Sequence, residues 1–419
     1  MSETYTKFRN EVMAGGADNP DLEPTTGGRT AVIAFTVIFG LLAFLYVKSS
    51  WAFIFVIGLL VSIFLHELGH FVTARWTGMK ATQFFLFMGP KLWSFRRGET
   101  EYGVRAYPVG AFVRIIGMNN LDEVDPTDED RAYRNKSYPR RLLVITAGSV
   151  MHILIAIALL FAVYAVNGQR VETDRVGIGG VSAGYPADQA GVEAGDTVVS
   201  IDGVQPKTPE AFVAEIRSHQ PGDAVTLVLE RDGQTLTRTV GLGANPTKGD
   251  GFGKAFLGVS SGTEVAWSNE SVAQAAKDSV VDLVPVMWAS VGGVVKVLNP
   301  VNIVGHLIGT NNDPTTQPTT VVGIGRLSNT IGKESGLGGV LITLAAVNVF
   351  VGLLNMFPVL PFDGGHAAIA TYERLRSRRG RPPYRADITK MMPVAMTMIA
   401  LLATLFITAF YLDFAKPPG

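Results

Sequence analysis

Two histidines and a glutamate in the run His66-Glu67-Leu68-Gly69-His70 have the residue types and spacing for metal chemistry. On a helix, residues four positions apart share a face, so both imidazoles can reach one ion while Glu67 lies beside it. Zinc held in this way lowers the pKa of a bound water to about 7, and a neighbouring carboxylate can accept the proton. The motif therefore predicts hydrolysis at a zinc site. The alternative is a hydrogen-bonded polar cluster between helices.

The motif lies within an apolar run, Trp51–Ala74, that is long enough to cross a bilayer. Titratable side chains in such a run cost several kcal/mol unless they are paired, which favours a functional role. Hydrophobic residues make up 47% of the chain and charged residues only 17%, values typical of a membrane protein. The chain has no cysteine, so histidines and carboxylates are the available metal ligands. Its 36 basic and 36 acidic residues give no basic excess that would suggest nucleic acid as a partner.

A third ligand is needed, because two histidines leave a tetrahedral site incomplete. Asp363 is the other acid at membrane depth, and it follows the run Asn355-Met-Phe-Pro358-Val-Leu-Pro361-Phe. The two prolines break a helix, and Gly364-Gly365 permits tight backbone geometry. Irregular backbone at this depth is tolerated only where it is buried or lines a cavity. Asp363 is therefore the predicted third ligand, with a solvated turn at a helix end as the alternative.

Five apolar runs predict an α-helical polytopic membrane protein with about five transmembrane helices. The runs are Ala31–Val47, Trp51–Ala74, Leu142–Val166, Val340–Pro358 and Met391–Tyr411. A further stretch, Val280–Ile308, is also apolar, but charged, Asn and Pro residues interrupt it. We interpret it as an interfacial helix on the outer face.

Loop charges predict the orientation of these spans. The connection 73–141 carries 12 Lys and Arg, and 371–390 carries 7, whereas 167–340 has 12 basic and 18 acidic residues. The positive-inside rule places the two basic loops in the cytoplasm and the long segment outside. Only a count of five spans puts both basic loops on one side.

The long outer segment contains a predicted α+β domain. A strand at Val176–Val181 is followed by an Ala-Gly turn and by Gly195–Gly203, which reads GDTVVSIDG. Two alternating runs then flank Arg231-Asp-Gly233, which is a hairpin signal. This succession resembles a PDZ domain of bacterial membrane proteases, and the alternative is another small β-domain.

Between the span that carries the HELGH motif and the next span, residues 80–118 give short alternating runs instead of an apolar span. The runs are Gln83–Phe87, Leu92–Arg96, Tyr102–Tyr107 and Ala111–Ile116, with Gly or Pro between them. They predict β-hairpins at the cytoplasmic membrane face. An exposed edge could hold an unwound substrate as an added strand near the zinc. The alternative is a cytoplasmic hairpin with no substrate role.

Together these features resemble the site-2 protease family of intramembrane zinc metalloproteases, over about residues 52–412. The likeness rests on HELGH, on NxxPxxPFDGG and on the intervening PDZ domain. It is nearest to the actinobacterial branch with a single PDZ domain, through the runs Arg75–Met79, Arg97–Tyr102 and Pro318–Gly323. The resemblance implies Zn²⁺ as cofactor, cleavage of peptide bonds inside transmembrane segments, and a multi-pass location in a bacterial plasma membrane.

The resemblance also implies roles for individual residues and for partners. It makes His66, His70 and Asp363 zinc ligands and Glu67 the general base. It places Asn348 and Asn355, and Pro108 and Gly110 of the β-region, in contact with substrate. The substrates expected are single-span membrane proteins such as anti-sigma factors, trimmed first by an upstream protease. The oligomeric state stays open.

Two features depart from the family pattern. The segment Gly148-Ser149-Val-Met-His152 stands where the family often has GPxxN. For His152 we expect an interhelical hydrogen bond, with a metal-binding role as the alternative. The second departure is the additional helix Ala31–Val47. Three more histidines remain. His366 follows the Gly-Gly turn, and a place near the site and a structural hydrogen bond are equal alternatives for it. His219 and His306 lie outside the predicted spans and are expected at the surface.

Two other classes of protein compete with this interpretation. A metal transporter would have ligands on several helices and neither the helix-breaking turn nor a PDZ domain. A catalytically inactive PDZ scaffold would not need Glu67 and a complete ligand set. The predicted segments are 1–28 (flexible, cytoplasmic), 29–50 (additional helix), 51–75 (catalytic helix), 76–141 (β-region and loop), 142–166 (helix), 172–242 (PDZ), 243–339 (linker with interfacial helix), 340–370 (helix with NxxPxxPFDGG), 371–390 (basic loop) and 391–412 (last helix).

Overall fold

The computed structural model describes residues 28–118, 122–231, 233–247, 251–268, 271–297, 299–311, 313, 316–377 and 383–415. The chain divides into two compact units. The membrane unit comprises Met1–Val163 and Ala276–Gly419, and the inserted unit comprises Tyr164–Ala275. The predicted N-terminal segment 1–28 lies, except for Gly28, outside the described residues.

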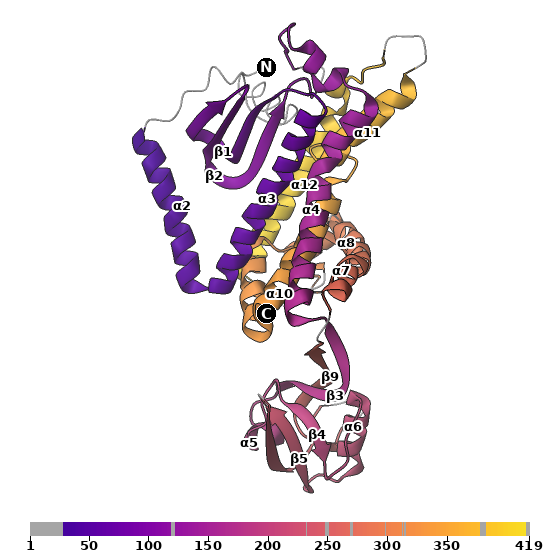
Figure 1. The fold of residues 1–419 in the computed structure, drawn as a ribbon. Coiled ribbons are helices and arrows are strands. Elements are labelled where there is room, and N and C mark those ends of the chain that lie inside the picture. The colour runs from indigo at the N-terminus through magenta and orange to yellow at the C-terminus, as the bar shows by residue number, and fades with distance from the viewer. Residues whose placement is uncertain are drawn as a thin grey trace. The chain divides into compact units, whose positions relative to one another are not determined.

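Long apolar helices make up most of the membrane unit (Figure 1). Six helical segments within the described residues are long and apolar enough to cross a membrane by length and composition. Four of the expected spans correspond to α2 (Gly28–Lys48), α3 (Ser50–Trp76), α4 (Tyr138–Asn167) and α12 (Met392–Ala415). The predicted interfacial stretch Val280–Ile308 covers the end of α7 (Val272–Val281) and all of α8 (Leu283–Val297) and α9 (Pro300–Ile308). The segment Val272–Val297 is a further candidate span.

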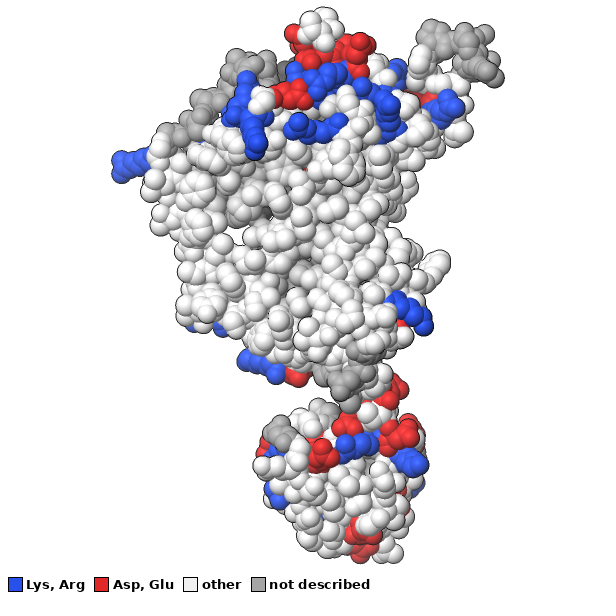
Figure 2. Space-filling view, viewed as in Figure 1, with Lys and Arg blue, Asp and Glu red and all other residues white. Residues whose placement is uncertain are grey.

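The outer surface of the membrane unit suits a lipid environment. Figure 2 shows a broad band of this unit almost without charged residues, with Lys, Arg, Asp and Glu gathered beyond the band. Large apolar side chains on the outer helices are freely exposed, among them Phe39 at 65% and Ile407 at 67%. Exposed apolar surface of this extent is expected for helices that contact lipid tails. The chain is therefore a polytopic helical membrane protein.

Contacts between α3, α4 and α10 (Val321–Asn355) set the directions of the central helices. The start of α3 lies beside the first half of α10, where the Ser49 hydroxyl donates a 2.7 Å hydrogen bond to Asn329. Farther along both helices, Gly58 lies against Leu344, so α3 and α10 run in the same direction. The middle of α4 packs on the last third of α10, with Ser149 against Gly352. Helix α4 runs antiparallel to both.

Helix α10 begins earlier than the sequence predicts. We expected residues before 340 to belong to a linker, yet the helix starts at Val321 and has one non-helical residue, Gly336. Several glycines and charges lower the hydropathy of this first half and conceal it in the sequence. The glycines serve close packing instead: a Cβ at Gly332 would lie 2.2 Å from the Trp51 ring. The predicted segment 340–370 is also two helices, since α10 ends at Asn355 and α11 begins at Asp363.

The N-terminus of α10 is capped by a residue of the last helix. Asp413 of α12 is fully buried. Its Oδ2 accepts hydrogen bonds from the backbone N–H of Thr320 at 3.0 Å and of Gly323 at 3.1 Å, and from the Thr320 hydroxyl. The carboxylate thus satisfies helix N–H groups that have no partner within the helix.

Strands β1 (Ala81–Arg97) and β2 (Thr100–Ile115) form the β-region of the membrane unit. Both strands bend, so that Phe84 pairs with Tyr102 on one side and with Val113 on the other. The second half of β1 forms a hairpin with the first half of β2, with pairs that run from Lys91↔Arg105 to Arg97↔Thr100. The two strands thereby give four runs close to those expected from the sequence. The run Ala111–Ile115 pairs only with the first part of β1 and so lies at an edge of the sheet, and we call it the outer run. Apolar side chains under this region pack against α3, with Phe71 against Phe84.

The inserted unit has a five-stranded sheet in the order β6-β5-β4-β3-β9. The strands are β3 (Arg170–Val181), β4 (Thr197–Ile201), β5 (Ala224–Arg231), β6 (Gln234–Gly241) and β9 (Val259–Trp267), and the helices are α5 (Pro186–Gln189) and α6 (Pro209–Ser218). The expected domain ended at 242, but β9 completes the sheet by pairing with β3. A short pair, β7 (Gly243–Ala244) with β8 (Ala255–Phe256), precedes β9. Alternating residues of the strands fill one apolar core with Phe212 and Ile216 of α6.

Candidate metal centre

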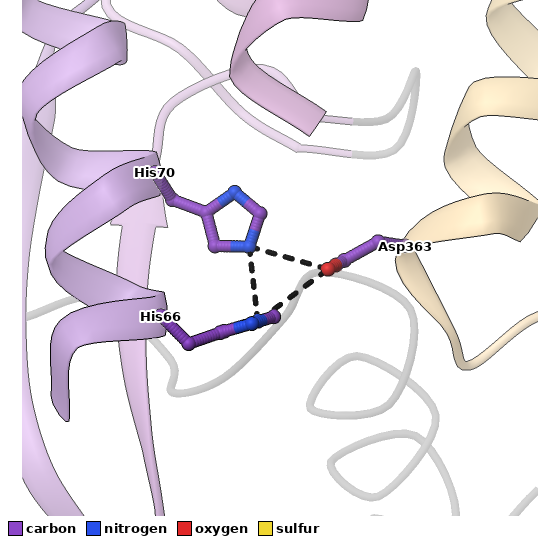
Figure 3. Close-up of side chains that lie close together, drawn as sticks. All are labelled: His66, His70 and Asp363. Carbon is purple, nitrogen blue, oxygen red and sulfur yellow. Dashed lines mark hydrogen bonds and ion pairs between the residues drawn. The ribbon is translucent and has the colours of Figure 1, made fainter. Parts of the chain in front are cut away.

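Three side chains from two helices converge on one point in the membrane unit (Figure 3). His66 Nε2 and His70 Nε2 lie 3.2 Å apart. Asp363 Oδ2 lies 3.4 Å from the first and 3.3 Å from the second nitrogen. These three atoms form a nearly equilateral triangle, and His66, His70 and Asp363 are the group of residues that could hold a metal ion within the described part of the chain.

The two histidines owe their common direction to the regular geometry of α3. The helix begins with a cap, in which the Ser49 hydroxyl accepts a 3.1 Å hydrogen bond from the Ala52 N–H. Because His70 follows His66 by four residues, the two side chains lie on the same face of the helix. His70 Nδ1 lies 2.7 Å from the Val144 carbonyl of α4, so Nδ1–H donates there and Nε2 is free to face a metal. The sequence motif predicts the face but not the Val144 partner.

Gly148 of α4 allows this helix to approach both histidines. A Cβ built on Gly148 would lie 2.4 Å from His66 Cε1 and 2.4 Å from His70 Nε2. Any larger residue would push at least one imidazole out of place. The Gly148-Ser149 pair was singled out in the sequence only as a departure from the family pattern, and this steric role is new information from the structure.

Asp363 reaches the histidines because the chain stops being helical before it. Residues 356–362 form turns between α10 and α11 (Asp363–Arg376), and Asp363 is the first residue of α11. The turns pack tightly on the start of α11: a Cβ on Gly364 would lie 2.2 Å from the Met356 carbonyl oxygen, and one on Gly365 would lie 2.5 Å from the Leu360 nitrogen. Both glycines are therefore required for the backbone course that the two prolines predict.

Glu67 follows His66 on α3 and lies beside the triangle of candidate ligand atoms. Its side chain is partly exposed within the membrane unit. The backbone N–H of Val113 in β2 lies near its carboxyl group. Val113 also pairs with Phe84 of β1, so the outer run Ala111–Ile115 has one side on the sheet and the other toward Glu67.

His152 and Asn348 form a buried hydrogen bond between α4 and α10. His152 Nδ1 lies 2.8 Å from Asn348 Oδ1, and the Asn348 amide N–H donates a 2.8 Å bond to the Leu344 carbonyl. The interhelical hydrogen bond expected for His152 is thus confirmed. Asn348 is fully buried, which favours a role in holding His152. Its contact with substrate stays a prediction.

The remaining residues of interest differ in exposure. Asn355 ends α10 and is partly exposed, Pro108 is exposed, and Gly110 has a φ of +72° in the turn before the outer run. The expectation that His306 lies at the surface is wrong. Its side chain is only 4% exposed and pairs with the Thr316 hydroxyl at 3.0 Å, because α9 folds back on the following turn.

The fold and the site define a membrane-embedded peptidase. The model of peptidase family M50 matches residues 54–401, and the chain belongs to this family. The chain is 30% identical to Zinc metalloprotease Rip1 of Mycolicibacterium smegmatis over 405 residues, covering 87% of this chain and 97% of that protein. It is 31% identical to Zinc metalloprotease Rip1 of Mycobacterium tuberculosis, with the same coverage. A PDZ domain of an SdrC-like protein from Listeria monocytogenes is 26% identical and covers 22% of this chain and 92% of its own, with a TM-score of 0.19.

Proposed function

We propose that this protein is an intramembrane protease of the site-2 type whose zinc ion is held by His66, His70 and Asp363. The triangle of ligand atoms carries the proposal. Ligands ~2.0–2.1 Å from a tetrahedral zinc lie ~3.3 Å from one another. The three distances of 3.2, 3.3 and 3.4 Å fit that geometry. The names of the Rip1 relatives support zinc as the metal.

Glu67 is the proposed general base. When bound, zinc supplies a Lewis acid that polarises the scissile carbonyl and acidifies water. The Glu67 carboxylate accepts the proton of the attacking water and passes it to the amine of the departing peptide. Since Glu67 follows His66 by one residue, about 100° around the helix, it faces the same space without taking a ligand position. His152, held by Asn348, packs beside His66 at 4.9 Å between ring centroids and keeps that ring in place.

The outer run Ala111–Ile115 is the proposed docking edge for substrate. A peptide bond in a transmembrane helix is hydrogen-bonded and hidden, so the substrate must unwind before cleavage. An unwound segment added along this edge would lie beside Glu67, because the backbone of Val113 in the same run lies near the Glu67 carboxyl group. We place Gly110 and Pro108 at the entrance to this edge and Asn355 on the opposite wall.

Five crossings with a cytoplasmic N-terminus are the proposed topology in a bacterial plasma membrane. The direction of α4 brings its C-terminal end to the end of the bundle where α3 and α10 begin. The chain therefore leaves α4 and re-enters α10 at the same end, and a single crossing by Val272–Val297 would not allow this. We propose that α7 to α9 enter the bundle from that end and return to it without crossing, with Gly293 of α8 against Phe350 of α10, and that the inserted unit is extracytoplasmic.

The proposed substrates are single-span membrane proteins, with anti-sigma factors trimmed by an upstream protease as the leading class. Support comes from the family and from the apolar surroundings of the site, which admit a transmembrane segment and exclude a soluble polypeptide. The PDZ-like inserted unit then controls access by recognising the shortened end of the substrate, or by excluding longer ones.

Cleavage in reconstituted membranes tests the function. The purified protein is mixed in lipid vesicles with a single-span test substrate, and the product ends are located by mass spectrometry. We expect cuts inside the apolar segment, loss of cleavage with a chelator, and recovery on adding zinc. Cuts only in the polar flanks, or cleavage that resists complete removal of metal, would contradict the proposal.

Reporter fusions at Gly233 and after Ala415 test the topology, and a cytoplasmic signal at either point contradicts it.

A further inference from the structure

A buried ion pair joins the two helices that shape the metal centre. Arg141 lies in the first turn of α4, and its Nη1 lies 2.8 Å from Glu373 Oε2 of α11. The two side chains are only 8% and 6% exposed. Buried ion pairs add little net stability compared with apolar packing, whereas loss of one partner leaves a costly unpaired charge. Their effect is to fix which groups face each other.

Both residues are held by further contacts. The Arg141 guanidinium stacks on the buried Tyr133 ring, 4.8 Å from its centroid. Glu373 Oε1 accepts a 2.8 Å hydrogen bond from the Ala386 N–H, and Arg385 lies 3.7 Å from Oε2. Arg141 and Glu373 thus belong to a buried polar cluster in which each makes a contact beyond the pair itself.

The ion pair joins the helix that contacts the two histidines, α4, to the helix that carries Asp363, α11. On α4, Val144 and Gly148 follow Arg141 by three and seven residues and therefore share its face. They are the residues that contact His70 and both imidazoles respectively. On α11, Glu373 follows Asp363 by ten residues, about 15 Å along the same helix.

Apolar packing of α11 in the cluster that contains Val144 and Ile145 of α4 uses small side chains. The face of α11 packed in this region consists of the small residues Ala367 and Ala370. Alanines allow close approach but offer few interlocking atoms, so they specify position weakly. The Tyr138 hydroxyl lies 3.2 Å from that of Thr371, which is a second polar contact between the two helices.

We propose that Arg141 and Glu373 are positioning residues that set the distance from Asp363 to the two histidines and thereby the zinc affinity. The proposal rests on the zinc site described under Proposed function. Loss of the pair allows α11 to shift, and a small displacement of Asp363 opens the triangle. Supporting partners of metal ligands typically contribute about 10–100-fold in metal affinity.

Zinc titration of the full-length protein tests this in detergent or vesicles. We expect Glu373→Gln to weaken zinc binding by about 10–100-fold. The matched control is Glu101→Gln, which breaks the equally buried ion pair to Lys91 (2.8 Å) in the β-region. Zinc affinity in this control should stay at the wild-type value. Equal affinity in Glu373→Gln and wild type would overturn the proposal.

A second variant serves if Glu373→Gln does not fold. Arg141→Lys keeps the charge but cannot both stack on Tyr133 and reach Glu373, so zinc affinity should fall several-fold, and an unchanged affinity would overturn the proposal. Saturation with Co²⁺ gives an independent readout, since its visible absorption depends on coordination geometry. An altered spectrum in the folded variant supports positioning, and a wild-type spectrum overturns it. Failure of the zinc site itself is distinct, because His66→Ala would then bind zinc as tightly as wild type.

Discussion

The membrane unit and the inserted unit use polar residues in opposite ways. The inserted unit has an apolar core in which Val225 and Leu229 are fully buried, and its ion pairs lie mostly at the surface. The membrane unit has an apolar exterior and buries His66, Arg141, Glu373 and other polar groups among its helices. In water the hydrophobic effect shapes a core, whereas in lipid directed polar contacts must specify the interior. We therefore expect the loss of one buried polar contact to disturb the chemistry of the membrane unit. The loss of one surface ion pair should leave the inserted unit folded.

The largest expected effect comes from changing the base while keeping the metal. Glu67→Gln preserves shape and leaves the three ligands intact. Turnover should fall by at least about 10²–10⁴-fold, while zinc stays near one per chain. Metal analysis and a cleavage assay on the same preparation measure both quantities. His66→Ala is the matched variant and should lose zinc as well as activity. Wild-type turnover in the zinc-loaded Gln variant would remove Glu67 from the mechanism.

The next effect concerns the ligand from the broken helix. Asp363→Asn keeps the size of the side chain but removes the anionic oxygen that completes the triangle. Zinc affinity should fall by more than the 10–100-fold typical of supporting residues, and activity should fall with it. Competition with a chelator of known affinity gives the number. Full zinc together with full activity would mean that another group is the third ligand.

A core substitution in the inserted unit should be costly locally and silent at the metal. Leu229→Ala creates a cavity at a fully buried position. We expect a loss of about 2–5 kcal/mol in the free energy of unfolding of this unit. Hydrogen exchange of its amides in the full-length protein measures the loss, with zinc content as the control. A fall in zinc content would contradict the independence of the two units.

Removal of the inserted unit should change selectivity rather than chemistry. Its strands β3 and β9 pair from Arg170↔Trp267, so the chain enters and leaves the sheet at neighbouring residues. A short Gly-Gly link in place of 171–266 therefore keeps the ends in place. We expect cleavage of an already shortened substrate to persist and longer substrates to be cut as well. Complete loss of cleavage in a folded deletion, with normal zinc, would assign the unit a catalytic role.

The smallest expected effect is a pH dependence of the inserted unit. Burial alone would raise the pKa of Asp196, but hydrogen bonds from Arg231 and from the Glu193 N–H outweigh it and lower that pKa. A carboxylate with a lowered pKa stabilises the fold above its ordinary value, near 3.9. That stability is lost as the pH falls through the lowered value. Asp196→Asn should therefore flatten the acid limb of the unfolding curve, and an unchanged acid limb would contradict the assignment.

Local patterns in the sequence predict much of the site, and long-range contacts do not follow from them. The four-residue spacing of His66 and His70 and the prolines before Asp363 each encode their geometry locally. Four β-runs were also evident from alternation. The support by Val144, Gly148 and the Arg141–Glu373 pair joins residues far apart in the sequence, and no periodicity reveals it.

The early start of α10 was missed for a related reason. Its first half is rich in glycine, which lowers apparent hydropathy, although the glycines serve close packing against Trp51 and Asp413. The sequence predicts His306 at the surface because it lies outside the predicted spans, and only the return of the chain to Thr316 buries it.

The cap on α10 has a consequence for the order of assembly during synthesis. Thr320 and Gly323 obtain their acceptor from Asp413, which is made only after α12 has been translated. A nascent chain that has inserted α3, α4 and α10 already contains all three proposed metal ligands once Asp363 has emerged. It still lacks the anchor of the helix leading to that aspartate. We therefore expect chains that lack α12 to hold the candidate metal centre less firmly than the complete chain does.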